Sequence, residues 1–237
     1  MEKKAVLFDL DNTLYDYEIP HRKALKAVHA ELKKKIDISF VKFKRLYDLS
    51  KGEIHRELSG LASSHNRVIY FQRLIEKTHN TVDPAMILRL YSVYWDSLLK
   101  NAKLSDGVLE TLKEIKKRGL RIGIVTDLTT HIQLRKIQSL GITRHVDVLV
   151  SSEEAGSEKP HAIMFLLALN KLDLSPHEVV FVGDNSTNDI EGANAVRMDS
   201  VLIKHGPLAK DVEEDYRKPN FVISKISEVL NILDGTL

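Results

Sequence analysis

The chain has 237 residues, of which 43% are hydrophobic and 29% charged, so it can bury a sizeable core as one large domain or as a domain with an insertion. The formal net charge of +2 gives no reason to expect nucleic acid as a partner, and the absence of cysteine excludes disulfides, thiolate catalysis and cysteine-ligated zinc. No stretch approaches the ~18 apolar residues of a membrane span, and the apolar run near residue 6 is too short for a signal peptide. We therefore expect a cytoplasmic protein with no membrane partner.

The first predicted element is a buried strand that runs into the stretch VLFDLDNTLYD, residues 6–16. Two acids, Asp9 and Asp11, stand two residues apart where this strand should end. Like charges so close together at a strand end are unfavourable unless a cation or a substrate uses them. This pair is the first candidate for functional chemistry.

The next stretch, residues 17–101, contains no convincing strand. Its apolar residues follow helical spacing, as in Leu25, Val28 and Leu32, and residues 68–77 and 85–99 are also predicted helices. Asp83 and Pro84 form a suitable cap and first turn for the last of them. We interpret residues 17–101 as a helical cap domain inserted into a core made of residues 1–16 and 102–237.

From residue 102 onward, short apolar strands alternate with helices. The expected strands are 120–125, 146–150, 178–182, 200–203 and 221–223, and the expected helices are 129–140, 161–172, 189–196 and 225–233. Continuous apolar strands that alternate with helices are typical of a parallel sheet covered on both faces. The predicted fold class is α/β, with a doubly wound, Rossmann-like parallel sheet core and the helical insertion as a cap.

Polar residues gather at the expected ends of these strands. In an open parallel sheet, ligands bind at the carboxyl ends of the strands, so segments far apart in sequence should meet there. They bring two carboxylate pairs, a hydroxyl and an ammonium group: Asp9 with Asp11, Asp184 with Asp189, Thr126, and Lys159. Oxygen-only ligands suit Mg²⁺, and a hard cation beside a lysine and a hydroxyl suits a phosphate group.

The order of these residues resembles the four-motif signature of the haloacid dehalogenase-like hydrolase superfamily, and the helical insertion resembles its C1-type cap. The matching motifs are Asp9-x-Asp11-x-Thr13, then Thr126, then Lys159-Pro160, and finally Gly183-Asp184-x₄-Asp189. They span the α/β core from end to end. The resemblance implies a Mg²⁺-dependent hydrolase of phosphate esters.

The resemblance also implies roles for the first motif. Asp9 would attack phosphorus and form an aspartyl-phosphate. Asp11 would be the general acid for the leaving alcohol and then the base for the hydrolytic water, with its pKa raised by the neighbouring carboxylate. The implied metal ligands are Asp9, Asp11 through its backbone carbonyl, Asp184 and Asp189; Asp189 could instead be only a helix cap.

The phosphate group would be bound by Lys159, by Thr126 with its neighbour Asp127, and by backbone N–H groups after Asp9, beginning with Leu10. Relatives often carry Asn where this chain has Asp127, and a carboxylate facing phosphate would repel it. Asp127 therefore either caps the helix that starts near Thr129 or contributes to substrate selection. We favour the helix cap.

The predicted function is a phosphatase acting on small soluble phosphomonoesters, such as sugar, triose, glycolate or nucleotide monophosphates. The partner would be a small phosphorylated metabolite, and the protein would be a monomer or homodimer. Two alternatives stay open: a phosphomutase of the β-phosphoglucomutase type, and a non-catalytic protein that binds a phosphorylated metabolite. Substrate choice should depend on the cap, and its polar candidates are Tyr15, Tyr17, His21, Arg22, Lys51, Arg56 and Arg67.

Overall fold

The computed structural model describes residues 2–79, 81–204 and 215–236, and its centre is a six-stranded sheet in the order β3-β2-β1-β4-β5-β6. All of the strand pairs in it are parallel. The strands are β1 (Ala5–Phe8), β2 (Arg121–Thr126), β3 (Val148–Ser151), β4 (Val179–Gly183), β5 (Asp199–Ile203) and β6 (Phe221–Ile223). Because β1 lies between β2 and β4, with Phe8 level with Ile124 and Val182, the chain leaves these three strands side by side.

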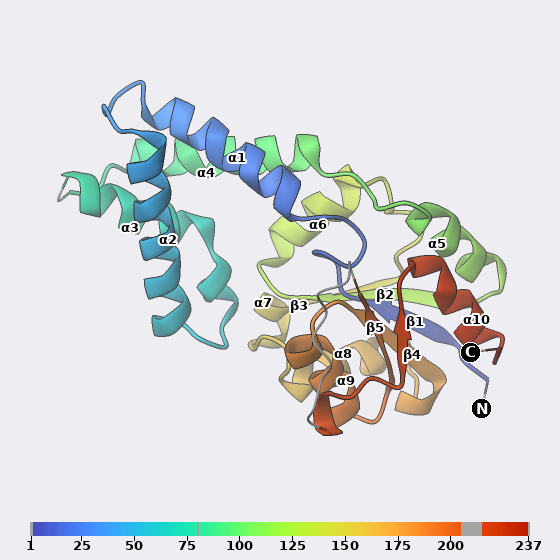
Figure 1. Ribbon diagram of the computed structural model, residues 1–237. Helices are drawn as coiled ribbons and strands as arrows, with labels where there is room; N and C mark the ends of the chain where they lie inside the picture. The colour runs from blue at the N-terminus through green and yellow to red at the C-terminus, as the bar shows by residue number, and fades with distance from the viewer. Residues whose placement is uncertain (1, 80, 205–214, 237) are drawn as a thin grey trace.

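Helices cover both faces of the sheet, with α5, α6 and α10 above it and α8 and α9 below it in Figure 1. Val6 and Phe8 of β1 pack into the upper layer, whereas Ala5 and Leu7 pack into the lower one, as the alternation of a strand requires. The helices of the core are α5 (Val108–Lys117), α6 (Thr130–Ser139), α7 (Ser152–Ala155), α8 (Ala162–Leu172), α9 (Glu191–Ala195) and α10 (Val229–Leu233).

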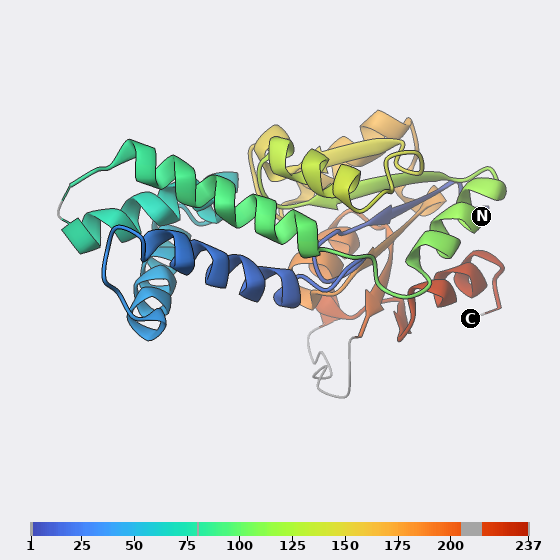
Figure 2. The same cartoon turned by 90° about the horizontal axis from the view of Figure 1, so that it is seen from above.

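Four helices between the first and second strands pack around a hydrophobic cluster of their own. They are α1 (Glu18–Leu32), α2 (Phe40–Glu57), α3 (Arg67–His79) and α4 (Pro84–Asn101). The long helices α1 and α4 lie side by side in both views and carry the chain away from the sheet and back to it (Figures 1 and 2). The cluster also includes Leu128 and Ile132, so these helices rest on the core beside α6. As predicted, Asp83 caps α4, accepting a hydrogen bond of 3.0 Å from the backbone N–H of Met86.

The predicted doubly wound α/β core with a helical insertion is confirmed. The sequence patterns missed the helices α5 and α7. The helix expected at 189–196 begins earlier, as the π-helical turn η3 (Ser186–Ile190), because the Asn185 side chain accepts hydrogen bonds from the N–H groups of Thr187 and Asn188. Short 3₁₀ turns complete the structure: η1 (Ala62–His65), η2 (Pro176–Glu178), η4 (Asp215–Arg217) and η5 (Ile226–Glu228). Within the described part of the chain, no helix combines the length and apolar character needed to cross a membrane.

Candidate active site

A cavity of about 250 Å³ opens where the chain leaves β1, β2 and β4. Most of its walls come from the α/β core, and its cap side comes from η1 and the first residue of α3. The lining residues are Asp9, Asp11, Asn12, His65, Arg67, Thr126, Asp127, Leu128, Lys159, Asp184, Asn185, Asn188 and Asp189. The four sequence motifs therefore converge on one small, mostly polar cavity.

Asp9 follows β1 directly and is held by two neighbours. Lys159 donates a hydrogen bond of 2.5 Å to one carboxylate oxygen, and the hydroxyl of Thr13 donates one of 3.1 Å to the other. Burial raises the pKa of Asp9 well above its ordinary value; Lys159 opposes this rise, and the carboxylates of Asp189 and Asp184 add to it. A further positive charge near Asp9 would therefore favour its ionised form.

A cation between the three acids would supply that charge. Carboxylate oxygens of Asp9, Asp184 and Asp189 lie within 4.8 Å of one another, and this hard, oxygen-only donor set fits Mg²⁺. A Cβ atom at Gly183 would lie 2.4 Å from the Asp189 carboxylate, so this close approach needs glycine. Asp189 is not the N-cap residue of η3 or of α9; those positions belong to Asn185 and Ile190.

Asp11 has a different environment from the one expected. Both of its oxygens accept hydrogen bonds from the ammonium group of Lys136, at 2.5 and 2.8 Å, and one also accepts from the Tyr15 hydroxyl. Burial would raise the pKa of Asp11, but the charge and hydrogen bonds of Lys136, together with Tyr15, lower it below its ordinary value. The expectation that a neighbouring carboxylate raises this pKa is wrong for this arrangement, because a cation faces Asp11.

Lys136 itself was missed by the sequence analysis. Its side chain is fully buried in α6, and its ammonium group lies 5.8 and 5.6 Å from the ring centres of Tyr17 and Trp95. A signal was present, since Lys136 lies four residues after Ile132 and four before Leu140, on the apolar face of the helix. A lysine on such a face is rarely buried without a partner, and here the partner is Asp11.

The second motif is also rearranged. The hydroxyl of Thr126 accepts a hydrogen bond of 2.8 Å from Gln133, and Asp127 accepts one of 3.0 Å from the backbone N–H of Lys159. The N-cap position of α6 belongs to Thr129, so the interpretation of Asp127 as a helix cap is wrong. Asp127 instead connects the segment after β2 to Lys159, while its neighbour Thr126 lines the cavity.

The side chain of Leu10 is fully buried in the core, so any contact of this residue with a phosphate group would come from its backbone. Among the seven cap candidates, Arg67 alone lines the cavity, whereas Arg22, Lys51 and Arg56 are exposed elsewhere. The two tyrosines contact residues that line the cavity. The hydroxyl of Tyr15 donates a hydrogen bond to Asp11, and the hydroxyl of Tyr17 accepts one from Arg67. His21 hydrogen-bonds Tyr94 at 2.7 Å inside the cap.

The cap meets the core next to Lys159. The hydroxyl of Ser64 donates to Glu158 at 2.8 Å, and a ring nitrogen of His65 lies 3.1 Å from the same carboxylate oxygen. Burial raises the pKa of Glu158 to about 7, and burial with the charge of Arg67 lowers the pKa of His65 to about 3. His65 is therefore neutral at pH 7. Neither Glu158 nor His65 was predicted, because nothing in a helical pattern shows which cap residues touch the core.

A carboxylate paired with a lysine beside an acidic cluster, at the strand ends of a parallel sheet, is the arrangement that the four sequence motifs predict. Comparison with known proteins agrees with this prediction. The model of the haloacid dehalogenase-like hydrolases matches residues 6–203. The chain belongs to this family, as the motifs predicted.

Several relatives are named as phosphatases of small phosphorylated molecules. The chain is 42% identical over 200 residues to a ribulose-1,5-bisphosphate 5-phosphatase from Halopiger xanaduensis, covering 84% of this chain and 83% of that protein. It is 31% identical to a glyceraldehyde 3-phosphate phosphatase from Methanopyrus kandleri, covering 97% of each chain. The crystal structure of a HAD phosphatase from Thermococcus onnurineus has a TM-score of 0.73 at 25% identity, with 98% of each chain covered. The prediction of a phosphoric monoester hydrolase is confirmed.

Proposed function

We propose that this chain is a Mg²⁺-dependent phosphatase that removes a phosphate group from small phosphorylated sugars or related metabolites through an aspartyl-phosphate at Asp9. The main observation behind this proposal is the position of the Asp9 carboxylate. It accepts hydrogen bonds from Lys159 and Thr13, lies beside the acids Asp184 and Asp189, and lines a small cavity. Magnesium, when bound by Asp9, Asp184 and Asp189, would reduce the charge repulsion between the phosphate group and these carboxylates.

In the first step, a carboxylate oxygen of Asp9 forms a bond to phosphorus while the bond from phosphorus to the leaving oxygen breaks. Asp11 gives its proton to that oxygen, and the alcohol leaves. Lys159 stabilises the negative charge of the phosphoryl oxygens, which Thr126 contacts from the other side of the cavity. Asp11 carries for this step the proton that it removed from water in the preceding turnover, and its carboxyl group must turn from Lys136 toward the leaving oxygen.

In the second step, Asp11 is the base. It removes a proton from a water molecule, the water oxygen bonds to phosphorus, and the bond between phosphorus and Asp9 breaks to release inorganic phosphate. The ion pair with Lys136 keeps Asp11 ionised and thus ready for this step. The closeness of His65 and Arg67 to the cavity limits the space left for bulk water.

The substrate is proposed to be small because the cavity is small and capped. The names of the relatives, which act on a pentulose bisphosphate and on a triose phosphate, favour phosphorylated sugars. They do not favour the phosphomutase or the non-catalytic alternative. The cytoplasmic location and the state of monomer or homodimer stay predictions.

Release of inorganic phosphate from a panel of phosphorylated metabolites and from p-nitrophenyl phosphate, with and without added Mg²⁺, tests the proposal. We expect turnover that depends on Mg²⁺ and is reduced roughly 10⁴-fold or more in Asp9→Asn. Well-folded protein without turnover, or full activity in Asp9→Asn, would contradict the phosphatase reading. Transfer of phosphate between sugar positions without release would indicate the mutase.

A further inference from the structure

The cap contributes one cation to the cavity, and it is held differently from the lysines of the core. Arg67 is the first residue of α3 and lines the cavity. Its exposed fraction is 7%. Lys159 and Lys136 each form ion pairs with carboxylates of the site. Among the described residues, no carboxylate lies within ion-pair distance of Arg67.

The groups around Arg67 are neutral. One terminal nitrogen of the guanidinium group donates to the backbone carbonyl of His65 at 2.5 Å, and the other donates to the Tyr17 hydroxyl. The guanidinium carbon lies 5.3–5.6 Å from the ring centres of Tyr70, Tyr94 and Trp95. The Nε–H group is buried and has no hydrogen-bond partner.

A buried cation without a counter-ion and with a free donor is unfavourable unless a ligand completes it. Because a guanidinium group has five N–H donors and two are used here, at least one further acceptor can bind. A phosphate or carboxylate group fits this need, since it accepts two parallel hydrogen bonds from arginine. The aromatic rings around Arg67 hold the guanidinium group in position in the absence of such an anion.

Arg67 and Asp11 line the same cavity. The charge of Arg67 is one of those that act on Asp11, after the stronger effects of burial, Lys136 and Tyr15, and Asp11 is the residue that must reach the leaving oxygen. The phosphoryl group, in contrast, is held by Asp9 and Lys159 on the core side. The core side carries several carboxylates, so a second negative group of a substrate is repelled from it and attracted to the cap.

We propose that Arg67 binds a second anionic group on the leaving part of the substrate, so that this enzyme prefers small sugars with two anionic groups over singly charged phosphomonoesters. The second group is a phosphate, as in a sugar bisphosphate, or a carboxylate, as in a phosphorylated sugar acid. This inference rests on the proposed phosphatase function and names the substrate class of the same site.

Two matched substrate pairs test the preference in the unaltered enzyme. Ribulose 1,5-bisphosphate and ribulose 5-phosphate differ by the second phosphate group, and 3-phosphoglycerate and glyceraldehyde 3-phosphate differ by a carboxylate in place of an aldehyde. We expect kcat/KM to be about 10–100-fold higher for the doubly anionic member of at least one pair, which identifies the second group. Equal kcat/KM values, within about 3-fold, in both pairs would overturn the inference.

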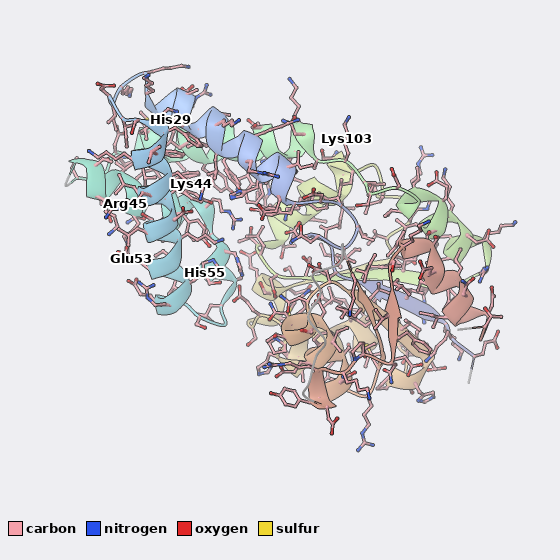
Figure 3. The ribbon with its side chains drawn as sticks, viewed as in Figure 1. His29, Lys44, Arg45, Glu53, His55 and Lys103 are labelled. Carbon is pink, nitrogen blue, oxygen red and sulfur yellow. The ribbon has the colours of Figure 1, made fainter. Side chains whose placement is uncertain are left out.

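The variant Arg67→Gln tests the residue. We expect it to lose about 10–100-fold in kcat/KM on the preferred substrate, mainly through KM, and less than about 3-fold on p-nitrophenyl phosphate, which has no second anion. Arg67→Lys should recover part of the loss. The matched control is Arg45→Gln, an exposed arginine on α2 of the same cap, which should leave all substrates unaffected (Figure 3).

An equal loss on every substrate in Arg67→Gln would overturn the inference, because it would place Arg67 on the transferred phosphoryl group. If Arg67→Gln does not fold, as judged by circular dichroism, the substrate pairs in the unaltered enzyme still decide. A failure of the proposed function looks different, since the unaltered enzyme would then release no phosphate from p-nitrophenyl phosphate either.

Discussion

The core side and the cap side of the cavity differ in how their charges are balanced. On the core side, Lys159 lies between Asp9 and Asp189, and Lys136 is paired with Asp11. On the cap side, Arg67 is surrounded by neutral carbonyl, hydroxyl and aromatic groups. This difference supports the proposal that the core side carries out the reaction common to all phosphate esters and that the cap side binds the part of the substrate that varies.

Among the variants that test this difference between the two sides, Lys159→Met should show the largest loss of activity. Without the ammonium group, the carboxylates of Asp9 and Asp189 repel each other and the incoming phosphate, so activity should fall at least about 10²–10³-fold. The loss should be equal on p-nitrophenyl phosphate and on sugar phosphates, as measured by phosphate release. The control Lys117→Met removes a lysine whose side chain is 82% exposed. A loss confined to doubly anionic substrates would break the comparison.

The variant Lys136→Met should show a smaller loss that depends on the leaving group. Without Lys136, Asp11 is no longer held in position, so kcat/KM on sugar phosphates, which reports the step in which the alcohol leaves, should fall about 10²-fold. The loss on p-nitrophenyl phosphate should be under about 10-fold, because its leaving group needs no proton. Lys136→Arg, which keeps the positive charge, should recover part of the activity. An equal loss of kcat/KM on both substrates would show that Lys136 does not act through Asp11 in the first step.

The same ion pair should be visible in stability. Asp11→Asn leaves the buried ammonium group of Lys136 unpaired, and we expect the free energy of unfolding to fall by about 2–3 kcal/mol, below the range for a fully buried pair because Asp11 is 30% exposed. The double variant with Lys136→Met should be more stable than the sum of the single effects predicts. Urea unfolding at pH 7 measures the cycle, and strict additivity would show that the two groups do not interact.

The smallest effect concerns pH and the contact between cap and core at Glu158. Its pKa of about 7 lies above the ordinary glutamate value, so the folded protein holds this proton more tightly than the unfolded chain. The contribution to stability is therefore complete at low pH and is lost as pH rises from about 4.5 to about 7. His65 stays neutral throughout this window, because its pKa is lowered to about 3.

Glu158→Gln stays neutral at every pH and should remove this part of the pH dependence. We compare the free energy of unfolding of the two proteins. We expect the difference between them to change by on the order of 1 kcal/mol or less between pH 5 and pH 8, since Glu158 is partly open to water. Urea unfolding at several pH values measures it. Parallel pH profiles for the two proteins would show that Glu158 does not titrate in this range.

The predictability of the site also differs between the two sides. Asp9, Asp184 and Lys159 follow strands or precede a helix, and parallel strands bring such positions together, so the sequence order was sufficient to predict them. Lys136 could not be paired with Asp11 from the sequence, because it lies inside a helix and not at a strand end, and helical spacing does not show which side chain a buried residue meets. The pKa of Asp11 was wrongly predicted for the same reason.

In the cap, helical spacing indicates which face of a helix is buried but not what that face meets. Arg67 therefore could not be separated from Arg56 in the sequence, although the structure buries the first and exposes the second. The division of the chain at residues 16–17 and 101–102 into core and cap stays a prediction. The helices of residues 18–101 do form a hydrophobic cluster of their own, which shares Leu128 and Ile132 with the core.

The most direct test of the central claim is to quench the enzyme during turnover and locate the protein-bound phosphate by mass spectrometry of its peptides. We expect a phosphoryl group on the carboxylate of Asp9, formed only with Mg²⁺ present and absent from Asp9→Asn. A phosphoryl group on another residue, or steady phosphate release by an enzyme that carries none under any quench condition, would contradict Asp9 as the nucleophile.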